Sequence, residues 1–112
     1  MDSDTFGNLP SYYAVIFTSS FQNEVDLSAY QEMAKMMLEL AKDQPGFLGY
    51  ETAREEVGIT VSYWQDLESI SKWKENEGHL RAQVKGRQSW YSKFKVRICR
   101  VEREYDFCSG KP

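Results

Sequence analysis

Histidine and cysteine are scarce in this chain of 112 residues, which has one histidine, His79, and two cysteines, Cys99 and Cys108. The two thiols have neither the spacing of metal ligands nor the density of a disulfide scaffold. Both are therefore expected to be reduced, as in a cytoplasmic protein, and Cys99 is expected to be a small core residue. No metal site is predicted. His79 is therefore the only side chain whose unperturbed pKa lies near neutral pH.

Long apolar runs are absent as well. No stretch of about 18 apolar residues occurs, so no membrane-spanning segment is expected. Residues 1–10 are acidic and lack the apolar region of a signal peptide. The chain also lacks a nucleophile–base pair and a phosphate-binding loop. No membrane-spanning protein is therefore expected, and no familiar catalytic motif points to a reaction.

The net charge of −3 is small, which argues against a general nucleic-acid binder. It is unevenly spread, because residues 1–56 carry an excess of acidic side chains and residues 57–112 an excess of basic ones. Two interpretations stay open. Either the two halves pack together and offset each other, or the basic half faces an anionic ligand.

The length and an ordinary composition, 41% hydrophobic and 28% charged, predict a single globular domain. We place this domain at residues 11–108, after a loose N-terminal arm (1–10) and before a short tail (109–112). Apolar periodicity predicts strands over 12–18, 47–54, 59–64 and 94–107, and a helix over 27–42. A second helix begins at Asp66, is broken or bent at Gly78, and is followed by a helical piece over 80–91. The order is β-α-β-β-α-β, an α+β fold of the ferredoxin-like kind with an antiparallel sheet.

Two details refine the helix over 27–42. Asp26 or Ser28 can cap its start, since a short side-chain oxygen accepts from an orphan backbone N–H. Its apolar residues recur at helical spacing and are expected to face inward: Leu27, Tyr30, Ala34, Met37, Leu38 and Ala41.

Two features of the strands favour a homodimer. The strand over 12–18 is apolar on both faces, although two helices can cover only one face of the sheet. The exposed face therefore requires a second sheet, and a second copy of the chain would supply it. The last strand changes the phase of its apolar residues near Cys99, which predicts a β-bulge or a segment that crosses to the partner.

The block from Ile59 to Trp90 holds all three tryptophans and the only histidine. A strand ends there in Tyr63 and Trp64, and the following helix carries Trp73, His79 and several basic residues. These residue types would suit a flat, apolar and perhaps anionic small molecule.

The motifs PGFLGYE in residues 45–51, VSYW-x-D in residues 61–66 and SKWKENEGH in residues 71–79 resemble the antibiotic biosynthesis monooxygenase group. The resemblance covers nearly the whole domain, from Tyr12 to Phe107. It implies a dimeric α+β barrel, in which two sheets face each other and each subunit has a pocket between sheet and helices. Some members oxidise aromatic polyketides with molecular oxygen and no metal or flavin, and others degrade heme.

The heme-degrading members use an Asn on the first strand, a Trp on the second helix and an iron-ligating His ten residues after that Trp. Trp73 matches the Trp, but Gln83 stands at the His position and Thr18 stands near the Asn position. Two of three markers are therefore missing. Heme degradation is disfavoured, while heme binding through His79 stays open.

The resemblance and the residue types together suggest a cofactor-independent monooxygenase. His79 would remove the phenolic proton of an aromatic substrate, and Arg87 would stabilise the resulting anion. The predicted substrate-binding residues are Phe17, Thr18, Trp64, Trp73 and Gln83. The alternative is a dimer that binds an aromatic metabolite or heme without turnover. The absence of familiar catalytic motifs is expected of both functions, so it does not distinguish them.

Overall fold

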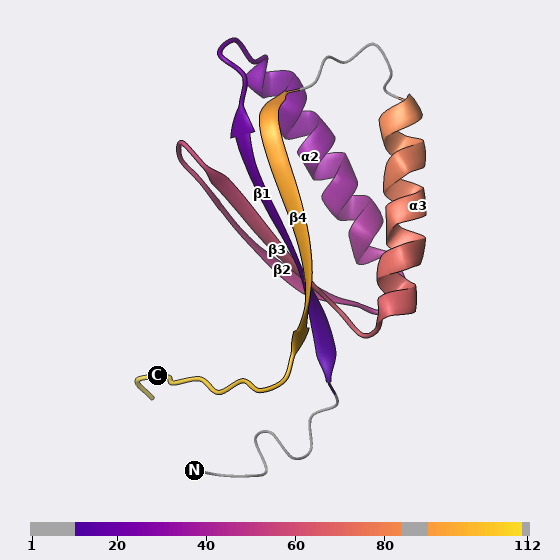
Figure 1. The fold of residues 1–112 in the computed structure, drawn as a ribbon, viewed down its shortest axis with the longest axis vertical. Coiled ribbons are helices and arrows are strands. Elements are labelled where there is room, and N and C mark those ends of the chain that lie inside the picture. Colours follow the sequence, from indigo (N-terminus) through magenta and orange to yellow (C-terminus); the bar gives the residue numbers. More distant parts are fainter. Residues whose placement is uncertain (1–10, 84–89, 111–112) are drawn as a thin grey trace.

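The computed structural model of the protein describes residues 11–83 and 90–110, and the side chains of residues 79–83 lie outside that description. Four strands form one antiparallel sheet: β1 (Tyr12–Phe21), β2 (Phe47–Arg54), β3 (Gly58–Trp64) and β4 (Tyr91–Val101). Their spatial order is β2-β3-β1-β4. Helices α2 (Leu27–Lys42) and α3 (Leu67–Gln83) both lie on one side of the sheet (Figure 1). The predicted α+β class, element order and antiparallel sheet are confirmed.

Each helix starts at an aspartate that caps it. Asp26 Oδ1 accepts a hydrogen bond from the backbone N–H of Ala29 at 3.0 Å, so Asp26 rather than Ser28 is the cap of α2. Asp66 Oδ1 accepts from the Ser69 N–H at 2.8 Å. Hydrogen bonds from the Ser69 side chain and backbone hold the pKa of the Asp66 carboxyl below its usual range.

The strand register arranges the side chains facing the helices in rows that cross the sheet. Directly paired residues share a face, and alternate residues of a strand share it too. Beginning at the β2–β3 turn, the rows on the helix side are Arg54–Gly58–Ser19–Phe94, Thr52–Thr60–Phe17–Val96, Tyr50–Ser62–Val15–Ile98 and Phe47–Trp64–Tyr13–Arg100.

The hydrophobic core lies at the last of these rows, where Trp64 is fully buried with Ala41 and Ile70. A turn at Gly46 closes this end of the molecule. Gly46 has a φ of 88°, in the left-handed region that favours glycine, and its carbonyl accepts from the Gln65 N–H at 2.7 Å. The turn delivers Phe47, whose ring centroid lies 5.2 Å from that of Trp64.

The second helix and the last strand differ from the prediction. Gly78 neither breaks nor bends α3 into two pieces, since the helix continues to Gln83. A glycine costs a helix only about 1 kcal/mol relative to alanine, which the rest of α3 tolerates. The helical piece expected over 80–91 is wrong at its end, because Tyr91 already belongs to β4. Residues 84–89 lie outside the described part of the chain.

The β-bulge expected near Cys99 is also wrong. β4 pairs with β1 without interruption from Lys93 to Val101, and the irregularity lies at the other end, between Ser20 and Phe21. Cys99 and Val101 change the phase because they lie on the other face of the same regular strand, opposite Phe94, Val96 and Ile98. The strand ends at Val101 rather than Phe107, so residues 102–110 follow no strand alternation. Cys99 is exposed on the face of β4 turned away from the helices, so its expected place in the core is wrong as well.

Helix α2 is turned slightly from its predicted orientation. Met33 and Ala41 are buried, whereas Leu27 and Ala34 are exposed. Of the three methionines in α2 (Met33, Met36 and Met37), Met33 is the one that is buried. Within residues 11–83 and 90–110, no helix has the length and hydropathy needed to cross a membrane.

The sheet surface turned away from the helices, which we call the open face, is apolar at its centre. Its members on β1 and β3 are Tyr12, Ala14, Ile16, Val61 and Tyr63. With the helix side of β1, this confirms that the first strand is apolar on both faces. Residues 102–110 run away from the sheet on the side opposite the helices (Figure 1).

Two tyrosines attach this segment and β2 to the open face. The hydroxyl of Tyr12 donates to Glu104, and that of Tyr63 donates to Glu51 at 2.7 Å. The two phenol rings meet edge to face with centroids 6.0 Å apart. The hydrogen bond to Glu104, with burial and the nearby negative charges, raises the pKa of Tyr12 from 10.0 to about 12. The pKa of Tyr63 is raised as well, first by its bond to Glu51.

We expect the attachment of residues 102–110 to loosen at high pH. Because the folded protein binds the Tyr12 proton more tightly, this contact stabilises fully below pH 10.0 and is lost as the pH rises toward about 12. A tyrosinate absorbance titration should show a late-ionising phenol that Glu104→Gln shifts to lower pH. An unchanged titration curve in that variant would contradict the assignment of the shift to Glu104.

Candidate functional site

The helix side of the sheet is only partly buried at its centre. Four helix-side residues of the two central strands, which we call the central floor, are half-buried: Val15, Phe17, Thr60 and Ser62. Residues on the covered face of central strands are normally packed densely by the opposing layer. Solvent therefore reaches the central floor, and a ligand could occupy the same space. Thr60 adds a polar element, since its Oγ1 lies 2.8 Å from Thr52 Oγ1.

A stacked tryptophan pair borders the central floor at the core end. The Trp64 and Trp73 ring centroids are 5.8 Å apart with an interplanar angle of 24°. Trp64 is 0% exposed, and its Nε1–H donates to Ser62 Oγ at 2.9 Å. Trp73 is half-buried. The structure thus brings both predicted tryptophans together, with Trp64 as the fully buried member of the pair.

A cluster of aromatic rings borders the central floor at its other end. It joins β1, α2 and the start of β4, with centroid separations from 4.8 to 6.1 Å, and its members are Phe17, Phe21, Tyr30, Trp90, Tyr91 and Phe94. Only Phe17 of this cluster was predicted as a site residue. The others were missed because they come from three separate elements that pack together only in the fold.

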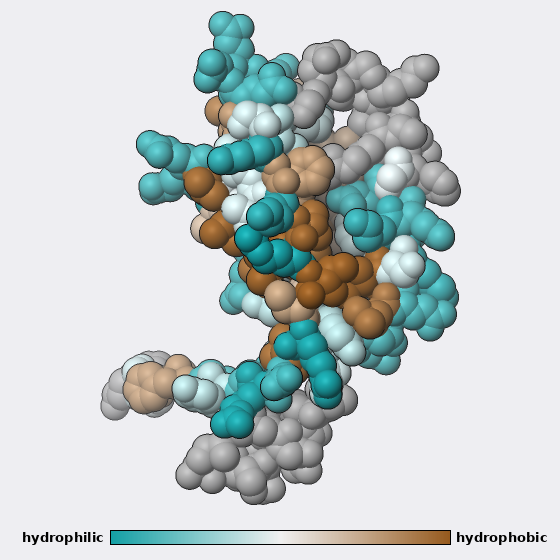
Figure 2. Space-filling view, in the orientation of Figure 1, coloured by the Kyte–Doolittle hydropathy of each residue, from teal (hydrophilic) through white to brown (hydrophobic). Residues whose placement is uncertain are grey.

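The helix side of β4 forms an apolar ledge beside the central floor. Phe94, Val96 and Ile98 are 60%, 38% and 46% exposed, although they share rows with Ser19, Phe17 and Val15. The helices pack over β2 and β3 and leave this edge uncovered. Figure 2 shows hydrophobic residues gathered in the middle of this face, where β4 meets the helix layer. The ledge gives the layer an apolar open side.

Arg54 enters the layer from β2 and was not predicted. Its Nη2 donates to Ser19 Oγ, and its guanidinium carbon lies 3.9 Å from the Phe21 ring centroid. A Cβ at Gly58 would collide with the guanidinium, so the glycine makes room for it. Arg54 places a positive charge beside the aromatic cluster.

The remaining predicted site residues do not gather around the central floor. Thr18 lies next to Phe17 in β1, so its side chain faces the open face instead. His79 and Gln83 lie in the last turns of α3, and their side chains are outside the description. Arg87 lies outside the described residues altogether. The roles of these four residues stay predictions.

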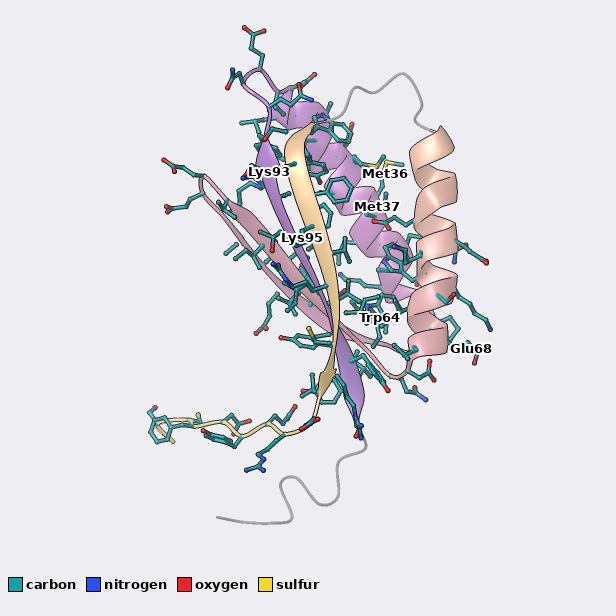
Figure 3. All side chains as sticks on the ribbon, in the orientation of Figure 1. Met36, Met37, Trp64, Glu68, Lys93 and Lys95 are labelled. Carbon is teal, nitrogen blue, oxygen red and sulfur yellow. The ribbon has the colours of Figure 1, made fainter. Side chains whose placement is uncertain are left out.

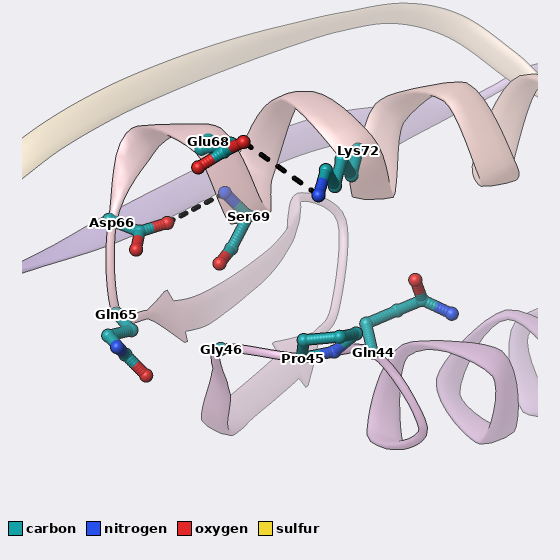
Figure 4. Close-up of a pocket in the computed structure, with 8 residues that line it drawn as sticks. All are labelled: Gln44, Pro45, Gly46, Gln65, Asp66, Glu68, Ser69 and Lys72. Carbon is teal, nitrogen blue, oxygen red and sulfur yellow. Dashed lines mark hydrogen bonds and ion pairs between the residues drawn. The ribbon is translucent and has the colours of Figure 1, made fainter.

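A separate surface pocket of about 220 Å³ lies where the two helix–strand junctions meet (Figure 4). Its lining is mostly polar: Gln44, Pro45, Gly46, Gln65, Asp66, Glu68, Ser69 and Lys72. Asp66 is engaged as the α3 cap, and Lys72 Nζ lies 3.8 Å from Glu68. No predicted site residue lines this pocket, and it gives no reason for binding an aromatic molecule.

The family assignment follows from comparison with known proteins. The family model described as Monooxygenase af470-like matches residues 17–99. The uncharacterised protein YqjZ of Bacillus subtilis is 48% identical over 97 residues, which cover 85% of this chain and 83% of YqjZ. The chain belongs to the Monooxygenase af470-like family. Its resemblance to the antibiotic biosynthesis monooxygenases is thereby confirmed.

Solved structures share the fold of this family member. SnoaB from Streptomyces nogalater, a cofactor-independent oxygenase, matches with a TM-score of 0.62 at 8% identity, covering 89% of this chain and 98% of SnoaB. MhuD, solved with manganese protoporphyrin IX bound, matches with a TM-score of 0.65 at 16% identity, covering 85% and 99%. At these identities the likeness establishes the fold alone.

Heme ligation of the MhuD-like kind finds no support in the described residues of this monooxygenase-family chain. Cys99 is exposed on the open-face side of β4, and Cys108 is exposed in the C-terminal segment. No group of three His, Cys, Asp or Glu side chains that could hold a metal occurs in the described part of the chain. Thr18, near the position of the family's Asn, faces away from the central floor.

Proposed function

We propose that this protein is a cofactor-independent monooxygenase that acts on an aromatic small molecule bound over the central floor. The observation that carries the proposal is the half-buried floor itself, bordered by Trp73 at one end and the aromatic cluster at the other. Aromatic walls and a few polar groups are what a flat substrate requires. The family and the fold support the same reading.

The reaction needs the protein mainly to hold and deprotonate its substrate. An electron-rich phenol or hydroquinone reacts with oxygen once it is an anion, and a site with few waters and fixed dipoles favours that anion. In a tricyclic phenol, the CH₂ group of the keto tautomer becomes a carbonyl. One oxygen atom of O₂ is retained, and the other leaves as water. The substrate supplies the electrons, so no external reductant is needed.

The catalytic roles in this proposal are those assigned from the sequence. His79 is the general base, since an ordinary pKa of about 6.5 suits proton removal near neutral pH. Arg87 would stabilise the anion. Phe17, Trp73 and Gln83 would bind the substrate. Trp64 is fully buried and would support Trp73, the half-buried member of the pair, whereas Thr18 faces the other side of the sheet and would take no part.

Oxygen uptake with anthrone and with simple hydroquinones tests the proposal. The wild-type protein should consume oxygen above the uncatalysed rate, and His79→Ala should lower that rate by about 100-fold or more. Trp73→Ala should weaken binding while the fold is retained. Lys74→Ala, an exposed position on the same helix, is the matched control and should leave the rate unchanged. A rate equal to background, or one that His79→Ala leaves unchanged, would sink the mechanism.

The alternative is a binding protein without turnover. Tryptophan fluorescence, with Trp64 and Trp73 beside the floor, reports binding independently of oxygen consumption. Quenching by aromatic ligands with no oxygen uptake would favour passive binding. A Soret shift on adding heme that disappears in His79→Ala would identify heme as that ligand.

The proposal includes a homodimer in the cytoplasm, in which the open faces of two sheets meet. The central apolar residues of the open face have no helix over them in the described part of the chain. Basic residues of β4 flank them on one side, and Figure 3 shows Lys93 and Lys95 directed away from the helices. Glu51 lies on the opposite edge strand, β2. A two-fold axis would bring these opposite charges into register.

A further inference from the structure

Arg54 occupies a row that is shaped to receive it. It pairs with Gly58, Gly58 pairs with Ser19, and Ser19 pairs with Phe94. The side chain crosses β3 over the glycine and reaches β1, where its Nη2 donates to the buried Ser19 hydroxyl. Larger residues at either position would close this path. The row therefore fixes a guanidinium on the helix side of the sheet rather than in solvent.

Aromatic rings lie against this guanidinium. Phe21 lies 3.9 Å from the guanidinium carbon and Tyr30 lies 5.7 Å from it, measured to the ring centroids. In the described part of the chain, Arg54 has no ion pair with a carboxylate. Ring faces attract a cation, but they accept no conventional hydrogen bond. The charge is held in place without being neutralised.

One buried nitrogen of Arg54 has no hydrogen-bond partner among the described residues. Among the described residues, Nη1 is the only buried side-chain nitrogen or oxygen that lacks one. Leaving a buried donor unsatisfied is unfavourable, and more so for a charged group. An acceptor oxygen at Nη1 would remove this penalty. Because Nη1 is buried, such an oxygen would require a neighbouring ring to turn aside, and side-chain rotations of this kind are fast.

The apolar ledge lies beside this charge. Phe94 closes the Arg54 row and is 60% exposed, and its ring stacks on Phe17 with centroids 5.4 Å apart. A flat ring placed on Phe17 and Phe94 would point an attached oxygen along the row toward the guanidinium. Adjacent strands are about 4.8 Å apart, so a substituent on a fused ring system spans the distance.

From this arrangement we infer that Arg54 recognises an anionic oxygen, a carboxylate or phenolate, on an aromatic ligand lying over the central floor. The inference rests on the proposed function for the location of the ligand, and it adds the substrate class: an aromatic acid rather than a neutral arene. Arg54 would thus offer the ligand a positive charge from β2, in addition to the one proposed for Arg87.

Two closely matched probes test the inference by calorimetry: 2-naphthoate, which carries a carboxylate, and its neutral amide, 2-naphthamide. A charge-assisted hydrogen bond should make the wild-type protein bind the acid roughly 10- to 100-fold more tightly than the amide. Arg54→Met should remove most of that preference and leave the amide affinity within about threefold. Lys35→Met, which removes an equal charge from an exposed position of α2, should leave both affinities unchanged.

A second set of measurements keeps the test decisive if Arg54→Met folds poorly. Arg54→Lys keeps the charge but loses the planar fork, and it should retain only part of the preference. The wild-type comparison alone overturns the inference if acid and amide bind equally, or if neither binds. A preference that survives in Arg54→Met overturns it too. Neither probe has an oxidisable CH₂ group, so failure of the oxygen-uptake experiment leaves this result standing.

Discussion

Replacing Trp64 by alanine should destabilise the protein by about 3–5 kcal/mol, a large part of the 5–15 kcal/mol typical of a domain. Trp64 is fully buried and touches both layers, with Phe47 from β2 and Trp73 from α3 packed on its ring. Removal of the indole leaves a cavity. It also removes the Nε1–H that donates to the Ser62 hydroxyl at 2.9 Å. Urea denaturation followed by far-UV circular dichroism measures the loss.

Leu67→Ala is the matched control for this experiment. Leu67 is 53% exposed at the start of α3, and its truncation should change the free energy of unfolding by less than about 0.5 kcal/mol. Trp64→Ala with a loss below about 1 kcal/mol would show that the core does not lie at this end of the sheet. Comparing Trp64→Ala with Trp73→Ala distinguishes the roles of the two tryptophans. Trp64→Ala should mainly lower stability, whereas Trp73→Ala should mainly weaken ligand binding.

The motifs of this sequence identify its fold because their residues form turns, core contacts and helix caps. The glycine of Pro45–Gly46 closes a turn that a side chain would clash with, Phe47 and Trp64 fill the core, and Asp66 caps α3. Each of these roles depends on neighbours in sequence or on one strand pairing, so local patterns reveal them. Gly78 led to a wrong prediction of a helix break because the local pattern does not show the packing of the whole helix. Its helical propensity is poor, but the packing of α3 as a whole decides whether the helix continues.

The site was harder to predict because it depends on register and exposure. Phe17 and Thr18 are adjacent in β1, and only their pairing shows that they face opposite sides. The orientation of Arg54 could not be predicted from strand alternation, because the register shifts between Phe47 and Gly49. Counting alternate residues from inward-facing Phe47 would point Arg54 outward, whereas the shifted register turns it inward. Its place opposite Gly58 in a hairpin was the signal that could have found it.

The exposed apolar surface of this chain is consistent with the proposed homodimer. On the open face, Ile59 is 44% exposed beside the apolar centre of β1 and β3. Tyr105 and Phe107, in the segment that extends away from the sheet, are 79% and 90% exposed. Isolated subunits seldom leave such residues to water over more than a few hundred Å². Pairing of two open faces, with each segment reaching across to the other subunit, would cover both features.

Light scattering at micromolar concentration should therefore give a particle near twice the chain mass of 13.1 kDa. An obligate interface of this kind would bury about 2,000 Å² or more in total. Deletion of residues 102–112 should weaken the dimer strongly, because it removes both exposed rings and the Glu104 acceptor of Tyr12. Deletion of 109–112 alone is the control and should leave it intact. A clean monomer at tens of micromolar would refute the pairing of open faces and the barrel on which the proposed pocket depends.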